Sequence, residues 1–108
     1  MKLLKSNNTC KNHPNMTLLL ETEIYERRRR TEHMSQYALA EKIGVTRNCI
    51  YLMESHTHIP KTETVFDIII ALGFSVEERK VFAEKYMEAY YKDKVVQEEL
   101  ERELAGAV

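Results

Sequence analysis

The sequence contains few cysteines, prolines and glycines, and it has no long apolar run. Its 108 residues include two cysteines, two prolines and three glycines. Cys10 and Cys49 cannot form a disulfide framework, so we expect both to be free thiols. No apolar run approaches the roughly 18 residues that a membrane-spanning helix needs. The opening MKLLKSNNTC has no apolar segment behind its lysines, which argues against a secretory signal and predicts a cytoplasmic protein.

The sequence also lacks a constellation for metal binding or catalysis. Cys10, His13, His56 and His58 do not have the paired spacing of a zinc site, and surface histidines in loops are the simpler interpretation. Nucleophilic catalysis needs a Ser or Cys with an oriented base and an oxyanion site, and no such group is indicated. We therefore predict no metal, no cofactor and no enzymatic activity.

Charge is unevenly distributed along the chain, although the net charge is only -1. Residues 1–61 hold ten Lys and Arg against six Asp and Glu, a net charge of +4. Residues 62–108 hold six Lys and Arg against eleven Asp and Glu, a net charge of -5. A basic front half and an acidic back half favour an interaction surface on one side of the molecule.

Hydrophobic periodicity and capping residues predict five helices and no strand. The expected helices run from Thr17 to about residue 33, from Ser35 to Gly44, from Thr46 to Glu54, from Glu63 to Leu72 and from Ser75 to Leu104. Ser75 and Glu78 form a capping box that opens the last and longest helix. The predicted organisation is a flexible arm over residues 1–16, a domain over 17–75 and a C-terminal helix over 76–108.

Only Gly44 and Val45 separate the second and third expected helices, as in a helix-turn-helix. The stretch MSQYALAEKIGVTRNCIYLMES and its continuation HTHIPKTETVFDIIIALGFS resemble the helix-turn-helix domain of phage-repressor-type regulators, the Cro/repressor or XRE family. The matching residues are Ser35, Gln36, Leu39, Ala40, Gly44, Val45, Ile50, Glu54, Pro60, Thr64, Leu72 and Gly73. The resemblance implies an all-α, five-helix, repressor-like DNA-binding domain, here with an extended C-terminal helix. The family often has glycine at the position of His56, where a left-handed backbone is usual.

The resemblance also implies that the third helix enters the major groove of DNA. Arg47 can donate two hydrogen bonds to guanine, Asn48 can pair with adenine, and Leu52 can contact a thymine methyl group. The predicted DNA-binding residues are Gln36, Thr46, Arg47, Asn48, Tyr51, Leu52, Thr57, His58 and Lys61. Alternatively, Arg47 and Asn48 belong to a plain solvated face, and Leu52 is an ordinary exposed leucine or packs beneath the C-terminal helix.

The run Arg27 to Arg30 cannot form one basic patch, because consecutive helix residues point in nearly every direction. In the family, one arginine of the first helix pairs with the acid that closes the third helix. The resemblance therefore implies a structural ion pair between Arg29 and Glu54, or between Arg28 and Glu54 if the intervening loop differs by one residue.

The acidic C-terminal helix should face away from DNA, because phosphates would repel it. Its apolar residues Tyr90, Val96, Leu100 and Leu104 form the predicted interface with a second copy or with a protein partner. The alternative is that the first half of this helix packs on the chain's own core while its end frays. We expect a mixture, in which the first half is core and the second half is interface.

These features indicate a dimeric, sequence-specific repressor that reads double-stranded DNA with residues 46–54. The alternative is an antitoxin-like protein, which binds a toxin partner through its C-terminal helix and autoregulates its operon. A third option is a scaffold that keeps the fold without binding DNA.

Overall fold

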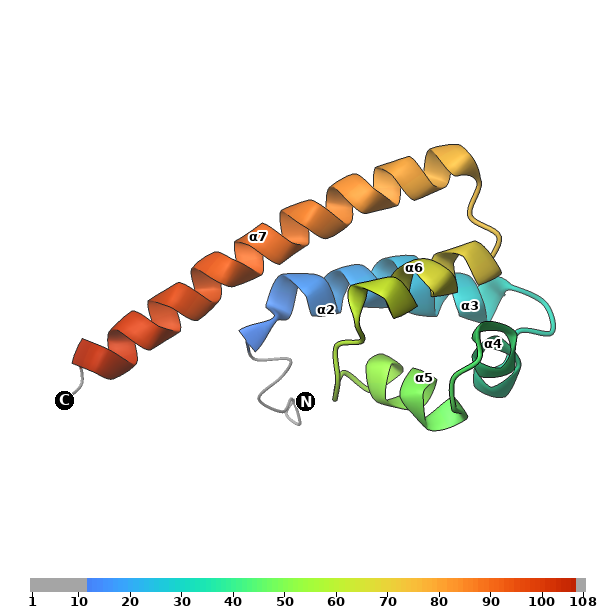
Figure 1. Cartoon of the computed structure of the whole chain (residues 1–108), viewed down its shortest axis with the longest axis horizontal. Helices are drawn as coiled ribbons and strands as arrows, with labels where there is room; N and C mark the ends of the chain where they lie inside the picture. Colours follow the sequence, from blue (N-terminus) through green and yellow to red (C-terminus); the bar gives the residue numbers. More distant parts are fainter. Residues whose placement is uncertain (1–11, 107–108) are drawn as a thin grey trace.

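Five helices make up residues 12–106, the part of the chain that the computed structural model describes (Figure 1). The first helix consists of three consecutive segments, α2 (Pro14–Leu20), the wider π-helical turn η1 (Glu21–Tyr25) and α3 (Glu26–Arg30). It is followed by α4 (Gln36–Ile43), α5 (Arg47–Glu54), α6 (Thr62–Ala71) and α7 (Val76–Gly106). No strand occurs in this range, so the predicted all-α architecture with a long C-terminal helix is confirmed. None of the described helices is long and apolar enough to cross a membrane.

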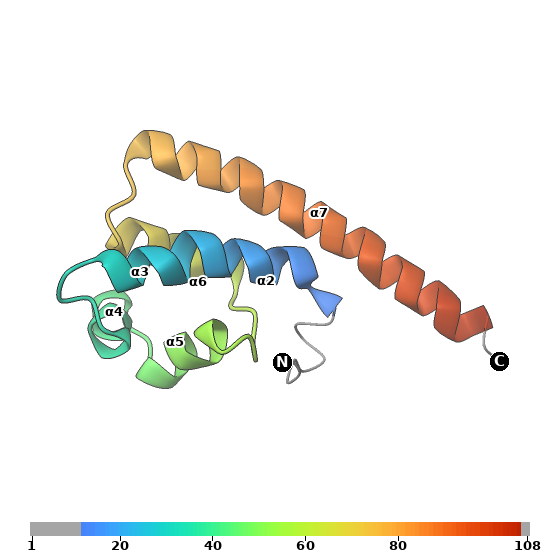
Figure 2. The same ribbon diagram turned by 180° about the vertical axis from the view of Figure 1, so that it is seen from behind.

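The helices place α7 and the α4–α5 pair on opposite edges of the molecule. α7 runs along one edge, α4 and α5 lie along the other, and α2 and α6 lie between them (Figures 1 and 2). The C-terminal part of α7 extends past the start of α2 (Figure 2). The long helix therefore has an inner side against the body, an outer side, and an end that projects beyond the body.

The first helix begins at Pro14, three residues before the predicted start at Thr17. Proline suits the first turn, because its missing N–H would have no helical partner there. Met16 is buried in the core, so the predicted arm over residues 1–16 is wrong at its C-terminal end. Thr17 lies inside the helix, and its hydroxyl is buried without a hydrogen-bond partner among the described residues. Residues 1–11 and 107–108 lie outside the described range.

Asp93 of α7 caps the start of α2 in place of a local residue. Its carboxylate accepts hydrogen bonds from the N–H groups of Asn15 and Met16 at 2.8 and 2.9 Å, and from the Asn15 side chain at 2.9 Å. A carboxylate at this end satisfies free N–H groups and interacts favourably with the helix dipole. One turn further along α7, Gln97 donates to the carbonyl oxygen of Asn12 at 3.3 Å. Asp93 is 2% exposed, so the middle of α7 is attached to the chain's own first helix.

Predicted capping residues begin three of the other helices. Ser35 and Thr46 each accept a hydrogen bond from the N–H group three residues on, at 3.0 and 3.3 Å. Ser75 and Glu78 form the expected capping box, with reciprocal hydrogen bonds of 3.1 and 2.8 Å. The Arg27 guanidinium also donates to Glu78 and, together with the Ser75 N–H, lowers the pKa of that carboxyl from its ordinary value. These hydrogen bonds confirm the predicted caps. The caps could be predicted because each involves only residues that are neighbours in the sequence.

A residue with a positive φ angle follows each of the first four helices. These residues are His33 at 61°, Gly44 at 80°, His56 at 62° and Gly73 at 84°. His56 therefore adopts the left-handed backbone that the family resemblance implied, at some cost for a residue with a Cβ atom. Its ring Nε2 lies 2.6 Å from the Glu21 carboxylate of η1, a contact that ties the turn after α5 to the first helix.

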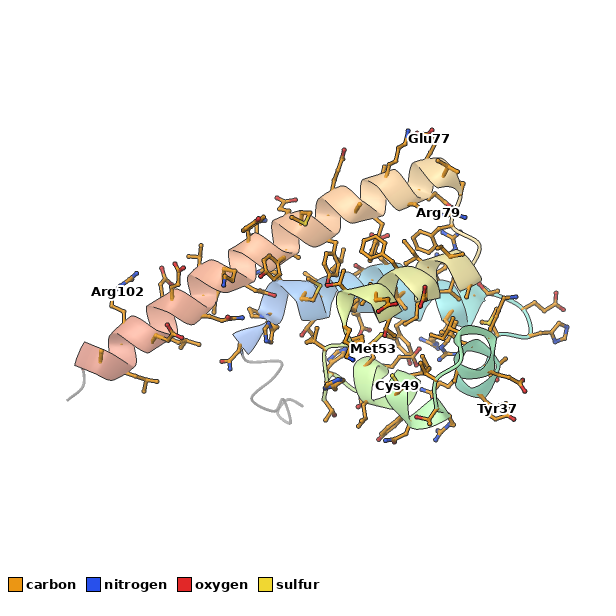
Figure 3. All side chains as sticks on the ribbon, viewed as in Figure 1. Tyr37, Cys49, Met53, Glu77, Arg79 and Arg102 are labelled. Carbon is orange, nitrogen blue, oxygen red and sulfur yellow. The ribbon has the colours of Figure 1, made fainter. Side chains whose placement is uncertain are left out.

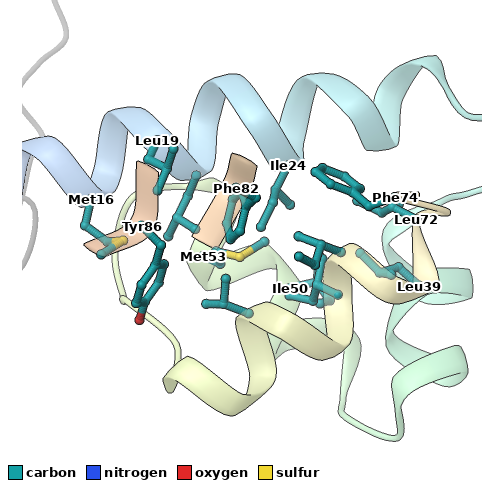
Figure 4. Close-up of a cluster of buried hydrophobic side chains, with 14 of the residues drawn as sticks. Met16, Leu19, Ile24, Leu39, Ile50, Met53, Leu72, Phe74, Phe82 and Tyr86 are labelled. Carbon is teal, nitrogen blue, oxygen red and sulfur yellow. The ribbon is translucent and has the colours of Figure 1, made fainter. Parts of the chain in front are cut away.

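The core is one cluster of apolar side chains to which all five helices contribute (Figure 4). Its members are Met16, Leu19, Leu20, Ile24, Leu39, Ala40, Ile50, Met53, Val65, Ile68, Ile69, Leu72, Phe74, Phe82, Tyr86 and Ala89. The Phe82 ring makes edge-to-face contacts with Phe66 and Phe74, at centroid distances of 5.5 and 5.9 Å. The first half of α7 therefore has the core role that was predicted for it.

Asp93→Ala is expected to lower the free energy of unfolding by about 1–3 kcal/mol, because two helix N–H groups lose their buried acceptor. Urea denaturation followed by circular dichroism measures the change. Lys94→Ala, at the next and exposed position of α7, is the matched control and should change the free energy by less than about 0.5 kcal/mol. A loss in Asp93→Ala no larger than that in the control would contradict the capping role.

Candidate nucleic-acid interface

The turn between α4 and α5 holds α5 with one side in the core and the other in solvent. Ile50 and Met53 are buried, and both appear within the core cluster in Figure 4. Thr46, Arg47 and Asn48, at the start of the helix, are exposed. The polar residues predicted to face DNA therefore occupy the side of α5 that is open to a ligand.

The Glu54 carboxylate, at the end of α5, joins three helices. It accepts hydrogen bonds from the Arg28 guanidinium of α3 at 2.5 and 2.9 Å and from the Gln36 side chain of α4 at 2.9 Å. Arg28 also donates to the carbonyl oxygen of Met34, in the loop before α4, at 2.9 Å. The side chains of Arg28 and Glu54 are only 12% and 3% exposed. This buried pair sets the orientation of α5 relative to α3 and α4.

The predicted pairing of Glu54 with Arg29 is wrong, because Arg28 occupies that position. This is the alternative that the sequence left open for a loop differing by one residue. Consecutive helix residues lie about 100° apart, so only one of the four arginines can face α5. Arg29 is exposed, and Arg27 pairs with the first turn of α7 at 3.1 Å. Two arginines of the basic run are therefore engaged in internal ion pairs.

The exposed side of α5 carries an arginine beside a tyrosine. The Arg47 guanidinium lies 5.7 Å from the centre of the Tyr51 ring, one helical turn away. Tyr51 is 45% exposed. Leu52 is half-buried and lies outside the core cluster, so part of its side chain remains at the surface. The ring of Tyr51 limits the positions that the Arg47 side chain adopts, and Arg47 remains exposed.

Gln36 stands at the first position of α4, with its side chain half-buried. One of its two amide hydrogens is used by Glu54, which leaves the other for a ligand. The adjacent Tyr37 is 63% exposed, and Figure 3 shows it at the surface of α4. Tyr37 was not among the residues predicted from the sequence. An aromatic residue with a hydroxyl group, next to the predicted phosphate-binding glutamine, was the signal that could have identified it.

The loop between α5 and α6 contributes the remaining predicted contacts. Thr57, His58 and Lys61 are all exposed. The Thr57 hydroxyl lies 2.9 Å from the Ser55 hydroxyl, and the Thr57 N–H donates to the carbonyl oxygen of Leu52 at 2.9 Å. The loop is thus bonded to the end of α5, and its exposed side chains lie in sequence and space directly after that helix.

The four residues of the predicted protein interface lie within about 120° of one another around α7, and they differ in exposure. Val96 and Leu100 are half-buried, whereas Tyr90 and Leu104 are 44% and 73% exposed. Leu100 and Leu104 line a hollow of about 270 Å³ at the projecting end of α7, together with His13. The end of α7 therefore offers apolar side chains that the chain's own described core does not cover.

Within residues 12–106, no three His, Cys, Asp or Glu side chains are close enough together to hold a metal ion. Cys49 is a half-buried free thiol in α5. Of the residues considered for zinc, Cys10 lies outside the described range. The chemistry that the described surface offers is hydrogen bonding by arginine, amide and hydroxyl groups.

The chain matches a family model described as helix-turn-helix over residues 24–79. The matched segment covers more than half of the 108 residues and extends from η1 to the first turn of α7. None of the curated proteins or solved structures compared with the chain matches it. The α4–α5 unit, the Arg28–Glu54 pair and the exposed side of α5 all lie inside the matched segment.

Arg28→Ala is expected to lower the free energy of unfolding by roughly 3–5 kcal/mol, because it leaves the Glu54 carboxylate buried without its charged partner. Arg29→Ala removes the same side chain from the next, exposed position and should cost less than about 0.5 kcal/mol. Thermal and urea unfolding of the two variants compare them directly. Equal losses, or a larger loss in Arg29→Ala, would contradict the assignment of the pair.

Proposed function

Because this chain belongs to the XRE-type helix-turn-helix family of DNA-binding transcriptional regulators, we propose that it is a repressor that binds operator DNA as a dimer. The observation that carries the proposal is the exposed polar side of α5, which a buried ion pair holds in a fixed orientation. Repression follows from occupancy, because a protein seated in the major groove of a promoter excludes other proteins from it. The same family membership gives no reason to expect an enzymatic activity.

Direct reading of bases is assigned to the first turn of α5. A helix enters the major groove with its N-terminal residues closest to the base edges. Arg47 suits the O6 and N7 atoms of guanine, and Asn48 suits the N6 and N7 atoms of adenine. Thr46 and the surface part of Leu52 lie beside them and suit a thymine methyl group. The Tyr51 ring next to Arg47 reduces the freedom that the guanidinium loses on binding.

Phosphate contacts are assigned to residues on either side of α5. Gln36 and Tyr37, at the start of α4, present an amide hydrogen and a hydroxyl group where the helix dipole favours an anion. Thr57, His58 and Lys61 present further donors from the loop after α5. Such contacts hold the protein in register on the duplex and carry no base preference of their own. The acidic α7 runs along the opposite edge, away from the phosphates (Figure 1).

The dimer contact is assigned to the projecting end of α7, with Leu100 and Leu104 at its centre and Val96 and Tyr90 beside them. The hollow below Leu100 and Leu104 opens where α7 extends past α2, so a second copy can dock there without displacing the core. Two copies related by a twofold axis at this end can both present α5 to the same duplex. Half-sites about one helical turn apart, roughly 34 Å, are the spacing that such a dimer reads.

Arg47→Ala and Asn48→Ala are each expected to relax the preference at one base position, with a loss of about 1–3 kcal/mol of discrimination. Gln36→Ala should weaken binding to all sequences alike, and affinity should fall steeply with salt. Selection from random DNA, followed by anisotropy titrations at several salt concentrations, measures these effects. Lys92→Ala, on α7, is the control. If neither α5 variant changes affinity or preference, the assignment of α5 is wrong.

Leu100→Ser combined with Leu104→Ser is expected to raise the dimer dissociation constant at least about tenfold, because burying each leucine contributes about 1.5–3 kcal/mol. Sedimentation equilibrium of the full chain measures it. Glu103→Gln, an exposed neighbour, is the control. These point variants are cleaner than a truncation before Gln97, which would also remove the contacts of Gln97 with Asn12 and His13. A double variant that associates like the unchanged protein would exclude this end of α7 from the dimer.

A further inference from the structure

The outer side of α7, turned away from the rest of the molecule, carries an apolar stripe. Met87, Tyr91 and Val95 follow one another at intervals of four residues, so they lie along one line of the helix. Their exposed fractions are 49%, 59% and 53%. Tyr90 packs its ring edge-on against Tyr91, at a centroid distance of 5.3 Å. We call Met87, Tyr91 and Val95 the outer stripe. Neighbouring exposed apolar side chains of this kind mark an interaction surface.

Charged residues extend the outer stripe in both directions along the same side of the helix. Glu77 and Lys80 precede it, and Glu98 and Arg102 follow it. All four are exposed, and none forms an ion pair with another side chain of the described residues. Figure 3 shows Glu77 and Arg102 projecting from the outer side of α7. Read in chain order, this surface is acid, base, acid, apolar stripe, acid, base, because the exposed Glu84 lies on the same side of the helix between Lys80 and Met87.

When the helix is paired with a reversed copy of itself, a base of the second copy lies near the height of each of these acids, and for Glu84 that base is Lys94. We propose that a second copy of this chain docks antiparallel on the outer stripe, across a twofold axis between Met87 and Tyr91. Met87 of each copy then contacts Tyr91 of the other. With a rise of about 1.5 Å per residue, Lys80 lies at the same height as Glu98 of the second copy. Glu77 lies within one residue of the height of Arg102 of the second copy.

The charges select this arrangement over the alternatives. In a parallel pair, each charged residue would lie opposite its own copy, and like charges would repel. In the antiparallel pair, each acid meets a base twice, because a twofold contact repeats every interaction. A stripe of three apolar side chains is small for a permanent interface, so the contact is expected to be weak and reversible. Most of this surface, from Lys80 onward, lies beyond the segment that matches the helix-turn-helix family.

The proposed contact has a consequence for DNA, which rests on the function proposed above. α7 lies on the edge of the molecule opposite α5 (Figure 1), and the outer stripe is on the exposed side of α7. Two copies joined through it therefore present their α5 helices in opposite directions, and they cannot read adjacent half-sites of one duplex. Each copy can instead belong to a different DNA-bound dimer. The contact thus joins two separate DNA segments.

Charge reversal on the outer side of α7 tests the contact. Lys80→Glu and Glu98→Lys each turn two attractions into two repulsions, and each is expected to raise the dissociation constant of the contact at least about tenfold. The double variant restores opposite charges and should return the constant to near its original value. Glu99→Lys, about 100° round the helix from Glu98, makes the same charge change and should leave the constant unaltered. Sedimentation velocity of the full chain at low salt, without DNA, measures all four.

The possible results of these experiments distinguish a failure of the outer-stripe contact from a failure of the proposed function. Single variants that associate like the unchanged protein, or a double variant that associates no better than the singles, would overturn the contact. Loss of dimers in the Leu100 and Leu104 variant tests the other end of α7 and leaves the charge-reversal pattern intact. Two differently dyed duplexes, carrying a sequence that the protein selects from random DNA, should show energy transfer with the unchanged protein and none with Lys80→Glu. No transfer with the unchanged protein would overturn the bridging of DNA.

Discussion

The position of the exposed, predicted DNA-binding side of α5 depends on one constraint, the burial of the Glu54 carboxylate. An acid that is 3% exposed must be paired, because an isolated charge in this position would carry a large desolvation cost. Its partners, Arg28 and Gln36, come from two other helices. The requirement that one carboxylate be satisfied therefore fixes three helices relative to one another. This arrangement sets the positions of the exposed residues of α5, although the described hydrogen bonds of the Glu54 carboxylate come from Arg28 and Gln36.

A second buried carboxylate, that of Asp93, connects α7 to the start of the first helix. The first helix begins without a side-chain cap of its own, and Asp93 supplies the missing acceptor from α7. This bond attaches the long helix beyond the point where the apolar core ends at Ala89. As a result, α7 contacts the body of the molecule as far as Gln97, and only its end projects. The projecting end of α7 and the outer stripe therefore both belong to a helix that is attached to the body of the molecule.

The fold uses the positive charge of the front half and the negative charge of the back half in different ways. Part of the positive charge in the front half is used internally, since Arg27 and Arg28 pair with Glu78 and Glu54. What remains near α5 is a small set of exposed donors and not a continuous basic patch. The acidic surplus lies mainly along α7, at the opposite edge. Its order along the outer side of that helix, and not only its sign, is what makes a reversed copy of the same helix a complementary partner.

The sequence by itself determined the helices that depend on neighbouring residues. Caps at Ser35 and Thr46 and the turn at Gly44 involve bonds across three or four residues, so local patterns predict them well. The resemblance carried by the same segment also identified the face of α5 that is exposed. Both the family and the architecture therefore follow from the amino-acid sequence alone.

The tertiary structure alone decided which side chains meet across the fold. It selected Arg28 over Arg29 as the partner of Glu54, a contact between residues 26 apart in the chain. It also moved the start of the first helix to Pro14, because the cap comes from Asp93, 77 residues after Met16. Such pairings depend on how helices rotate and pack against one another. Neighbouring helical residues point about 100° apart, so a choice between Arg28 and Arg29 needs the rotation of the helix to be known more finely than that. The order of residues along the chain does not give this rotation.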